Sequence, residues 1–155
     1  KEIIESGLTL EENASIKANT IYDYFNTSCI SDDTGLEVFS LNGAPGVFSA
    51  RYAGSHCNAN DNMAKLLKKL HGVNDRRARF RTVICLKNHK EEKIFEGCVN
   101  GIIHSKKEGS QGFGYDPVFI PNGYDVTFAQ MSLKEKNKIS HRAQAIKKLI
   151  KYLKF

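Results

Sequence analysis

Apolar side chains first recur at helical spacing between Leu10 and Phe25. Intervals of three and four residues place such side chains on one face of a helix. Thr9 stands just before this stretch and Glu12 follows it by three residues, which is the pattern of a capping box at a helix start. The sequence therefore predicts a helix that begins after Thr9 and ends near Tyr24 or Phe25.

Further along the chain, predicted strands and helices are interleaved. Short runs rich in apolar and β-branched residues predict strands, and apolar residues at helical spacing behind a capping residue predict helices. The predicted strands cover residues 28–31, 79–86, 93–99 and 118–120. The predicted helices cover residues 60–70, a short segment capped by Ser132, and a final segment capped by Ser140, with an inward stripe of Ile146, Leu149, Ile150 and Leu153.

No repeat or long linker divides the sequence, so we predict a single domain over residues 1–155. Interleaved helices and strands with a hairpin in the middle favour the α/β class, with a long mixed β-sheet flanked by helices. The composition, 41% hydrophobic and 26% charged, is that of a globular protein. No apolar run approaches the ~18 residues of a membrane span, and no signal peptide is visible.

The net charge of +6 favours anionic partners such as nucleotides, nucleic acids or acidic membranes. Many of the basic residues lie near the C-terminus, where a solvated helix face is favoured over a nucleic-acid patch. The four cysteines lack the spacing of a zinc site and predict reduced thiols in a cytoplasmic protein.

A first candidate for chemistry is the pair Asp32 and Asp33, which follows the predicted strand at 28–31 and precedes Thr34 and Gly35. Two carboxylates at a strand end can hold a divalent cation that binds triphosphate oxygens, while one of them orients or deprotonates a water. An ordinary Asx turn that closes a strand explains the same residues. These residues alone leave both interpretations open.

Residues 109–117 form a second candidate, a glycine-rich stretch that contains Phe113 and Tyr115. Glycines let a backbone approach a ligand closely, and an aromatic ring can stack on a purine. A flexible surface loop is the competing interpretation.

A third candidate is the stretch from Lys136 to Arg142. Ser140 as N-cap places His141 and Arg142 in the first helical turn, where a cation opposes the positive helix end. An arginine fork there can pair with a purine O6 and N7, although a solvated helix start also fits. Glu5, before a turn, and Lys17, about two helical turns after Leu10, are a fourth, weaker candidate for metal and substrate contacts.

Five stretches, residues 5–14, 32–36, 43–52, 112–117 and 139–142, together resemble the noncanonical purine nucleoside triphosphate pyrophosphatases, the inosine triphosphatase family. They occur in the family's order, and the resemblance runs along nearly the whole chain. It implies two lobes with a nucleotide cleft between them. It also implies hydrolysis of ITP, dITP or XTP to the monophosphate and pyrophosphate with Mg²⁺, by a cytoplasmic homodimer that cleanses the nucleotide pool.

The resemblance also implies roles for individual residues. Asp33 is the expected base, and the expected metal ligands are Asp33, Glu5 and Asp32. The expected substrate-binding residues are Lys17, Thr34, Phe113, Gly114, Tyr115, Asp116, Lys136, His141 and Arg142.

One feature departs from the family. Its members carry a phosphate-binding segment, Ser/Thr-x-Asn-x-x-Lys, upstream of the position where this sequence starts, and no such segment occurs in the first residues here. We therefore expect an N-terminally truncated member with weakened phosphate binding. Two alternatives stand beside an active enzyme: an inactive nucleotide-binding or dimerisation module, and a basic protein that binds nucleic acid without turnover. We expect neither membrane nor nucleic-acid partners.

Overall fold

The computed structural model describes residues 2–154 and has a four-stranded sheet in the order β1-β2-β3-β4. The strands are β1 (Cys29–Val38), β2 (Arg77–Lys87), β3 (Glu92–Ile103) and β4 (Phe119–Pro121). The predicted α/β class, with a sheet flanked by helices, is confirmed. All three pairings within this sheet are antiparallel, whereas the sequence predicted a mixed sheet.

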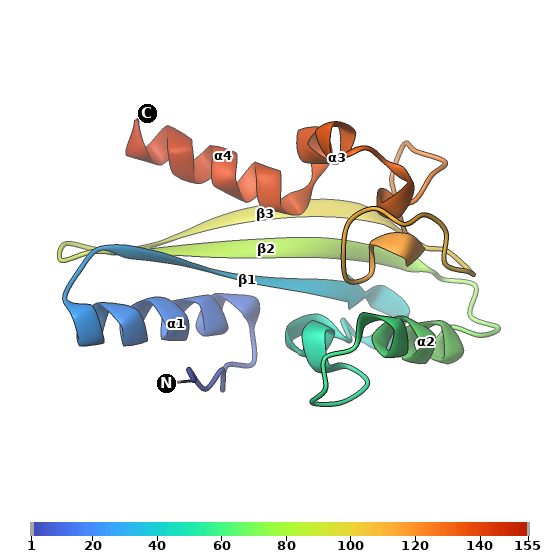
Figure 1. Cartoon of the computed structure of the whole chain (residues 1–155), viewed down its shortest axis with the longest axis horizontal. Helices are drawn as coiled ribbons and strands as arrows, with labels where there is room; N and C mark the ends of the chain where they lie inside the picture. The colour runs from blue at the N-terminus through green and yellow to red at the C-terminus, as the bar shows by residue number, and fades with distance from the viewer. Residues whose placement is uncertain (1, 155) are drawn as a thin grey trace.

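The helices explain this antiparallel pairing. Helix α1 (Leu10–Phe25) covers one face of the sheet, and α4 (His141–Leu153) covers the opposite face, preceded by the short helix α3 (Leu133–Ile139) (Figure 1). Helix α2 (Ala59–Lys69) stays at the end of the sheet where β1 finishes. Because the chain does not cross back over the sheet, β2 starts at that same end and runs antiparallel to β1.

Two predicted capping boxes are present. The Thr9 hydroxyl accepts from the Glu12 amide at 3.1 Å, and Ser132 with Glu135 repeats the arrangement at the start of α3. Ser140 caps α4 by accepting from the Ala143 amide, which places His141 and Arg142 in the first turn as predicted. Local hydrogen bonding of short polar side chains therefore sets these helix starts.

Strand β1 is longer than the sequence predicted. It was expected to end at Ser31, but its pairing with β2 continues residue by residue to Val38. Asp32 and Asp33 therefore lie within a strand and not at its end. The turn-forming character of Asp and Gly is overridden because the strand buries Leu36 and Val38 completely and its backbone groups are paired by β2.

The buried stripe of α4 also differs from the prediction. Leu149 is buried as expected, but Ile146, Ile150 and Leu153 are 40%, 44% and 41% exposed, and Ala145 takes their place in the contact. Helix α4 approaches β3 very closely at Gly97, where an added Cβ would lie 1.8 Å from the His141 carbonyl oxygen. Only a small side chain fits between elements at this separation, so the contact line runs through Ala145.

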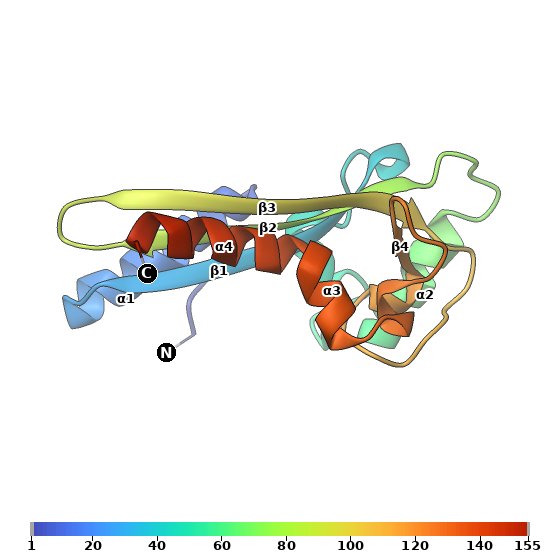
Figure 2. The same ribbon diagram turned by 90° about the horizontal axis from the view of Figure 1, so that it is seen from above.

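Three apolar clusters hold the elements together. The largest lies at the α2 end of the sheet. One smaller cluster lies between the sheet and α1, and the other lies between the sheet and α4. These two helices cover opposite faces of the sheet (Figures 1 and 2). His141 joins the core through its ring, which stacks on Phe80 with centroids 4.7 Å apart and an interplanar angle of 12°. The first turn of α4 is thereby fixed against the sheet at the edge of the large cluster.

Burial, together with the positive charges of Lys136 and Arg142, lowers the pKa of His141 to about 3. Between pH 6.5 and about 3 the unfolded chain binds a proton at this imidazole that the folded chain does not. The free energy of unfolding should therefore fall as the pH falls through this window, by up to about 1.4 kcal/mol per pH unit.

We expect His141→Gln, which removes the titration, to flatten this part of the stability profile in urea unfolding measurements. His89→Gln, at an exposed imidazole in the β2–β3 turn, serves as the control and should keep the wild-type slope. Equal slopes for His141→Gln and wild type would show that the imidazole is not held neutral by burial.

Candidate functional site

Two carboxylates converge on one ammonium group at the α1 face of the sheet. Lys17 from α1 donates to Asp33 Oδ1 at 2.7 Å, and its Nζ lies 3.2 Å from Glu5 Oε1. The two oxygens therefore lie close enough together to share a single positive charge. Glu5 comes from the segment before α1, which is held in place because the Gly7 amide donates to the side chain of the buried Asn13.

Burial raises the pKa of Asp33, and the hydrogen bond and charge of Lys17 oppose this rise only in part. For Lys17, burial alone would lower the pKa, but Asp33 and Glu5 outweigh it and the net shift is upward. The Asp33 side chain is only 12% exposed. Asp33 is therefore a weakly solvated carboxylate whose proton affinity is above that of an ordinary aspartate.

Asp32 lies on the other side of the sheet. Consecutive side chains of a strand point to opposite faces, and Asp32 accordingly forms an ion pair with Arg142 of α4, with Arg142 Nη2 2.9 Å from Asp32 Oδ2. Thr34, two residues on, shares this face and lies 3.4 Å from the same nitrogen. The sequence placed Asp32 with Asp33 and Glu5, but the structure does not bring it to them.

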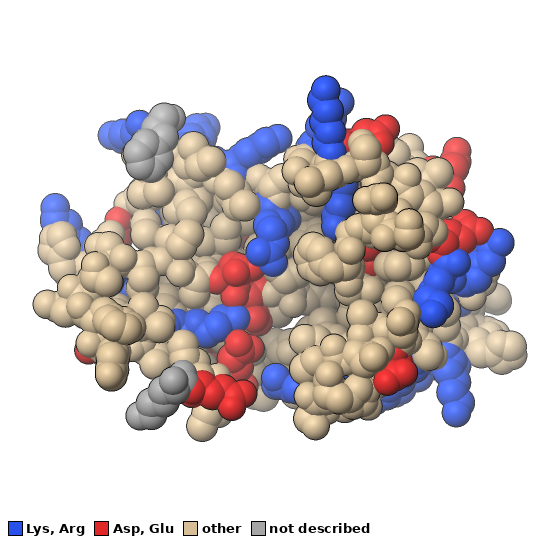
Figure 3. All heavy atoms as spheres, in the orientation of Figure 1, with Lys and Arg blue, Asp and Glu red and all other residues tan. Residues whose placement is uncertain are grey.

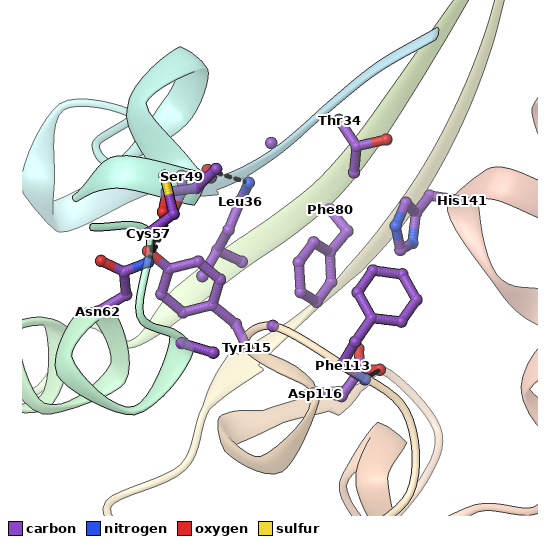
Figure 4. A pocket seen from close by; sticks show the side chains of 14 residues that line it. Thr34, Leu36, Ser49, Cys57, Asn62, Phe80, Phe113, Tyr115, Asp116 and His141 are labelled. Atoms are coloured by element: carbon purple, nitrogen blue, oxygen red, sulfur yellow. Dashed lines mark hydrogen bonds between the residues drawn. The ribbon is translucent and has the colours of Figure 1, made fainter. Parts of the chain in front are cut away.

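A cavity of about 300 Å³ opens beside Thr34 on the α4 side, within the range typical of small-molecule sites. Thr34, Phe80, Phe113 and His141 point toward one another at one end of it, as Figure 4 shows. Gly114 lines it too. Phe113 is 67% exposed, so much of its apolar side chain is open to a ligand.

His141, which lines this cavity, also carries a polar atom that is unpaired within residues 2–154. Its Nδ1 is buried and has no hydrogen-bond partner among the described residues. Buried polar atoms are rarely left unpaired in proteins, and those that are usually serve a ligand or a water. Since the imidazole is neutral, its two ring nitrogens offer one donor and one acceptor.

Asp116 and Lys136 hold the loop that contains Phe113 through hydrogen bonds. Asp116 Oδ2 accepts from the Phe113 amide at 2.9 Å and from Lys136 Nζ at 2.5 Å, and both side chains are buried. The Lys136 ammonium also lies 4.8 Å from the centroid of the Phe113 ring. A Cβ at Gly112 would lie 2.1 Å from Asp116 Oδ2, so this turn requires glycine.

Sequence reasoning missed Asn62, which lies at the other end of the cavity. Asn62 of α2 donates to the carbonyl oxygens of Ser49 and Ala50 and accepts from the Ala53 amide at 2.7 Å. Tyr115 donates to the same Ser49 carbonyl at 2.7 Å. Residues 49–52 belonged to a recognised motif, but no sequence signal marked Asn62, because its role is to hold a neighbouring backbone segment.

Acidic side chains are visible on one face of the molecule. Figure 3 shows acidic side chains beside a hollow near the middle of the face viewed, between the two ends of the molecule. Within residues 2–154, no three His, Cys, Asp or Glu side chains are grouped so as to hold a metal ion. None of the helices described is long and apolar enough to cross a bilayer.

Comparison with known proteins finds relatives along nearly the whole chain. Residues 1–152 match the model of the Ham1 family. A dITP/XTP pyrophosphatase of Flavobacterium psychrophilum is 52% identical over 154 residues, which are 99% of this chain and 81% of that protein. One of Bacillus licheniformis is 53% identical over 152 residues, covering 96% of this chain and 77% of that protein.

Solved structures give the same result for the fold. The Ham1 protein of Staphylococcus aureus superposes with a TM-score of 0.97 at 46% identity, covering 99% of this chain and 81% of that one. A HAM1 protein from Coxiella burnetii gives a TM-score of 0.95 at 38% identity, with the same coverage. The family resemblance drawn from the motifs is thereby confirmed, and the chain belongs to the Ham1 family.

Proposed function

We propose that this protein hydrolyses noncanonical purine nucleoside triphosphates, ITP, dITP or XTP, to the monophosphate and pyrophosphate. The observation that carries the proposal is the junction between Asp33 and Thr34. These consecutive residues belong to the carboxylate site and to the wall of the cavity, and their backbone positions are one residue spacing, ~3.4 Å of strand, apart. Their side chains face opposite sides of the sheet, but β1 is an edge strand of the described sheet, so a nucleotide can pass its free edge from one site to the other. One nucleotide can therefore place its base in the cavity and its phosphates by the carboxylates. The names of the pyrophosphatase relatives support the same reaction.

The residues that select the base lie in the first turn of α4. Arg142 lines a second cavity that shares Phe113 and His141 with the first, and it offers a guanidinium there, while neutral His141 offers a ring nitrogen. Hypoxanthine and xanthine carry a 6-oxo acceptor for such donors. Adenine has an amino group at the same position. Two hydrogen-bond donors would then face each other, and the protein donors would be left unpaired.

Glu5 and Asp33 fit the requirements of Mg²⁺. The ion prefers oxygen ligands and is usually bound by one or two carboxylates together with substrate phosphates and waters, which two converging carboxylates can satisfy. That both already hold an ammonium at 2.7 and 3.2 Å supports a place for positive charge between them. When bound, the ion would neutralise the phosphate charge and lower the barrier to attack.

A residue of this chain can accept the proton that the attacking water loses. A water attacks the α-phosphorus, the bond from the α-phosphorus to the bridging oxygen breaks, and pyrophosphate leaves. Asp33 accepts the proton that the water loses and so acts as the general base. Lys17, at hydrogen-bond distance from Asp33, orients this carboxylate and offers its ammonium to the phosphates.

Replacing Asp33 should stop turnover without unfolding the protein. We expect Asp33→Asn to lower kcat for ITP by a factor of at least ~100, because the amide neither accepts the proton nor binds the cation as a carboxylate does. Circular dichroism should show unchanged folding, since Lys17 keeps Glu5 as a partner. Asp23→Asn, at an exposed position of α1, is the matched control and should retain wild-type kcat. Near-normal turnover by Asp33→Asn would remove this residue from the mechanism.

Removing Arg142 should weaken the choice of base. A hydrogen bond from a charged donor is worth about 1.5–3 kcal/mol, so Arg142→Ala should narrow the ITP-to-ATP ratio of kcat/KM by about one to two orders of magnitude. Steady-state kinetics with both substrates at one Mg²⁺ concentration measure this ratio. Arg77→Ala, which removes an exposed arginine paired with Asp75, should leave it unchanged. If Arg142→Ala depresses both substrates alike, the arginine binds phosphate and not the base.

We further propose a homodimer, for which the family resemblance is the support. Sedimentation equilibrium should give twice the chain mass of 17.4 kDa at micromolar concentration. A single-chain mass under these conditions would contradict the dimer.

A further inference from the structure

The two carboxylates of the acidic motif act on different partners. Asp33 lies with Lys17 at the α1 face, whereas Asp32 lies with Arg142 at the α4 face. Adjacent strand residues cannot turn to the same face unless the strand is distorted, and β1 pairs with β2 without a break through both positions. Asp32 is therefore separated by the sheet from Glu5 and from the region where a cation would bind.

Arg142 depends on the β1 surface for its position. Its side chain is 46% exposed and stands in the first turn of α4, where the positive helix end does not favour a guanidinium. Its hydrogen-bond and ion-pair contacts among the described residues are the Asp32 carboxylate at 2.9 Å and the Thr34 hydroxyl at 3.4 Å. Thr34 is itself fixed by a hydrogen bond of 2.8 Å to Thr82 of β2.

Both contacts use the same nitrogen, Nη2, of the guanidinium. A guanidinium has five N–H donors in a rigid planar fork, so Nε and Nη1 remain available for a ligand. Because these contacts already hold the side chain, Arg142 loses less conformational entropy when it binds a ligand. The orientation of the guanidinium plane is also fixed before the ligand arrives.

The geometry points to Asp32 as a positioning residue for base recognition. It holds Arg142 so that the free edge of the guanidinium meets the 6-oxo group of the purine, and it is not a metal ligand. This inference rests on the proposed hydrolysis of ITP and related nucleotides. It divides the acidic motif between two tasks: Asp33 serves the reaction at phosphorus, and Asp32 serves the choice of substrate.

The Asp32–Arg142 pair can be broken without a large effect on folding, because half-exposed ion pairs add little to stability. The test compares Asp32→Asn, Arg142→Ala and the double variant. Asp75→Asn is the matched control, since it breaks another exposed Asp–Arg pair with a separation of 2.9 Å. For each protein, kcat/KM is measured with ITP and with ATP, together with the Mg²⁺ concentration that gives half the maximal rate.

We expect Asp32→Asn to narrow the ITP-to-ATP ratio about three- to tenfold, less than Arg142→Ala does, because the arginine is still present but no longer held. The double variant should match Arg142→Ala alone, since two residues that act through one interaction are not additive. The Mg²⁺ midpoint should not move. Loss of the Asp32 charge also alters the field at Asp33, but that effect is the same for both substrates and cancels in the ratio.

Three results would overturn the inference. A raised Mg²⁺ midpoint with an unchanged ratio would make Asp32 a metal ligand. Additive effects of Asp32→Asn and Arg142→Ala on the ratio would show that Asp32 acts independently of the arginine. An unchanged ratio and midpoint would show that the pair serves neither purpose. A wild-type protein without preference for ITP over ATP would instead contradict the proposed function itself, and the inference would fall with it.

Discussion

Every residue of β1 from Cys29 to Val38 has a partner on β2, and this pairing decides which way each side chain of the acidic motif points. Because a paired strand alternates between its faces, Asp33 goes to α1 while Asp32 and Thr34 go to α4. A slip of one residue in this register would exchange the two sets and leave both sites without their partners. The buried Leu36 and Val38 prevent such a slip, since it would carry them out of the core.

The start of α4 depends on a second constraint, its close approach to β3. Gly97 lets the His141 backbone lie against the strand, and the His141 ring stacks on Phe80 of β2. The same contact keeps the imidazole neutral and directs it into the cavity wall. In the proposed function, one side chain thus serves both packing and recognition of the base. This explains why a histidine can be buried at the start of a helix with a ring nitrogen unpaired.

Local signals in the sequence were enough to locate the helix starts and to select several residues that line the cavity. The capping boxes at Thr9 and Ser132 act through neighbouring backbone groups, so a sequence pattern reveals them directly. The length of β1 was not predictable in this way, because the motif Asp-Asp-Thr-Gly has the composition of a turn and becomes a strand only through pairing with β2. The buried side of α4 was also missed, since it depends on the small separation that Gly97 permits.

The division of Asp32 from Asp33 followed the same logic. Sequence proximity suggested that both carboxylates share one cation, and only the strand geometry separates them. Asn62 illustrates the opposite case, since it supports the cavity through hydrogen bonds to the backbone at Ser49 and Ala50 and carries no motif of its own. Residues that act through another segment are visible only when that segment has been placed.

The central claim is that β1 separates the chemistry at phosphorus from the choice of base. A crystal structure with Mg²⁺ and a nonhydrolysable analogue of ITP tests it most directly. The account predicts the purine in the cavity beside Phe113 and His141, with its 6-oxo group toward Arg142, and the metal ion bound by Glu5 and Asp33 on the α1 face. A metal ion ligated by Asp32, or a purine bound on the α1 face, would contradict it.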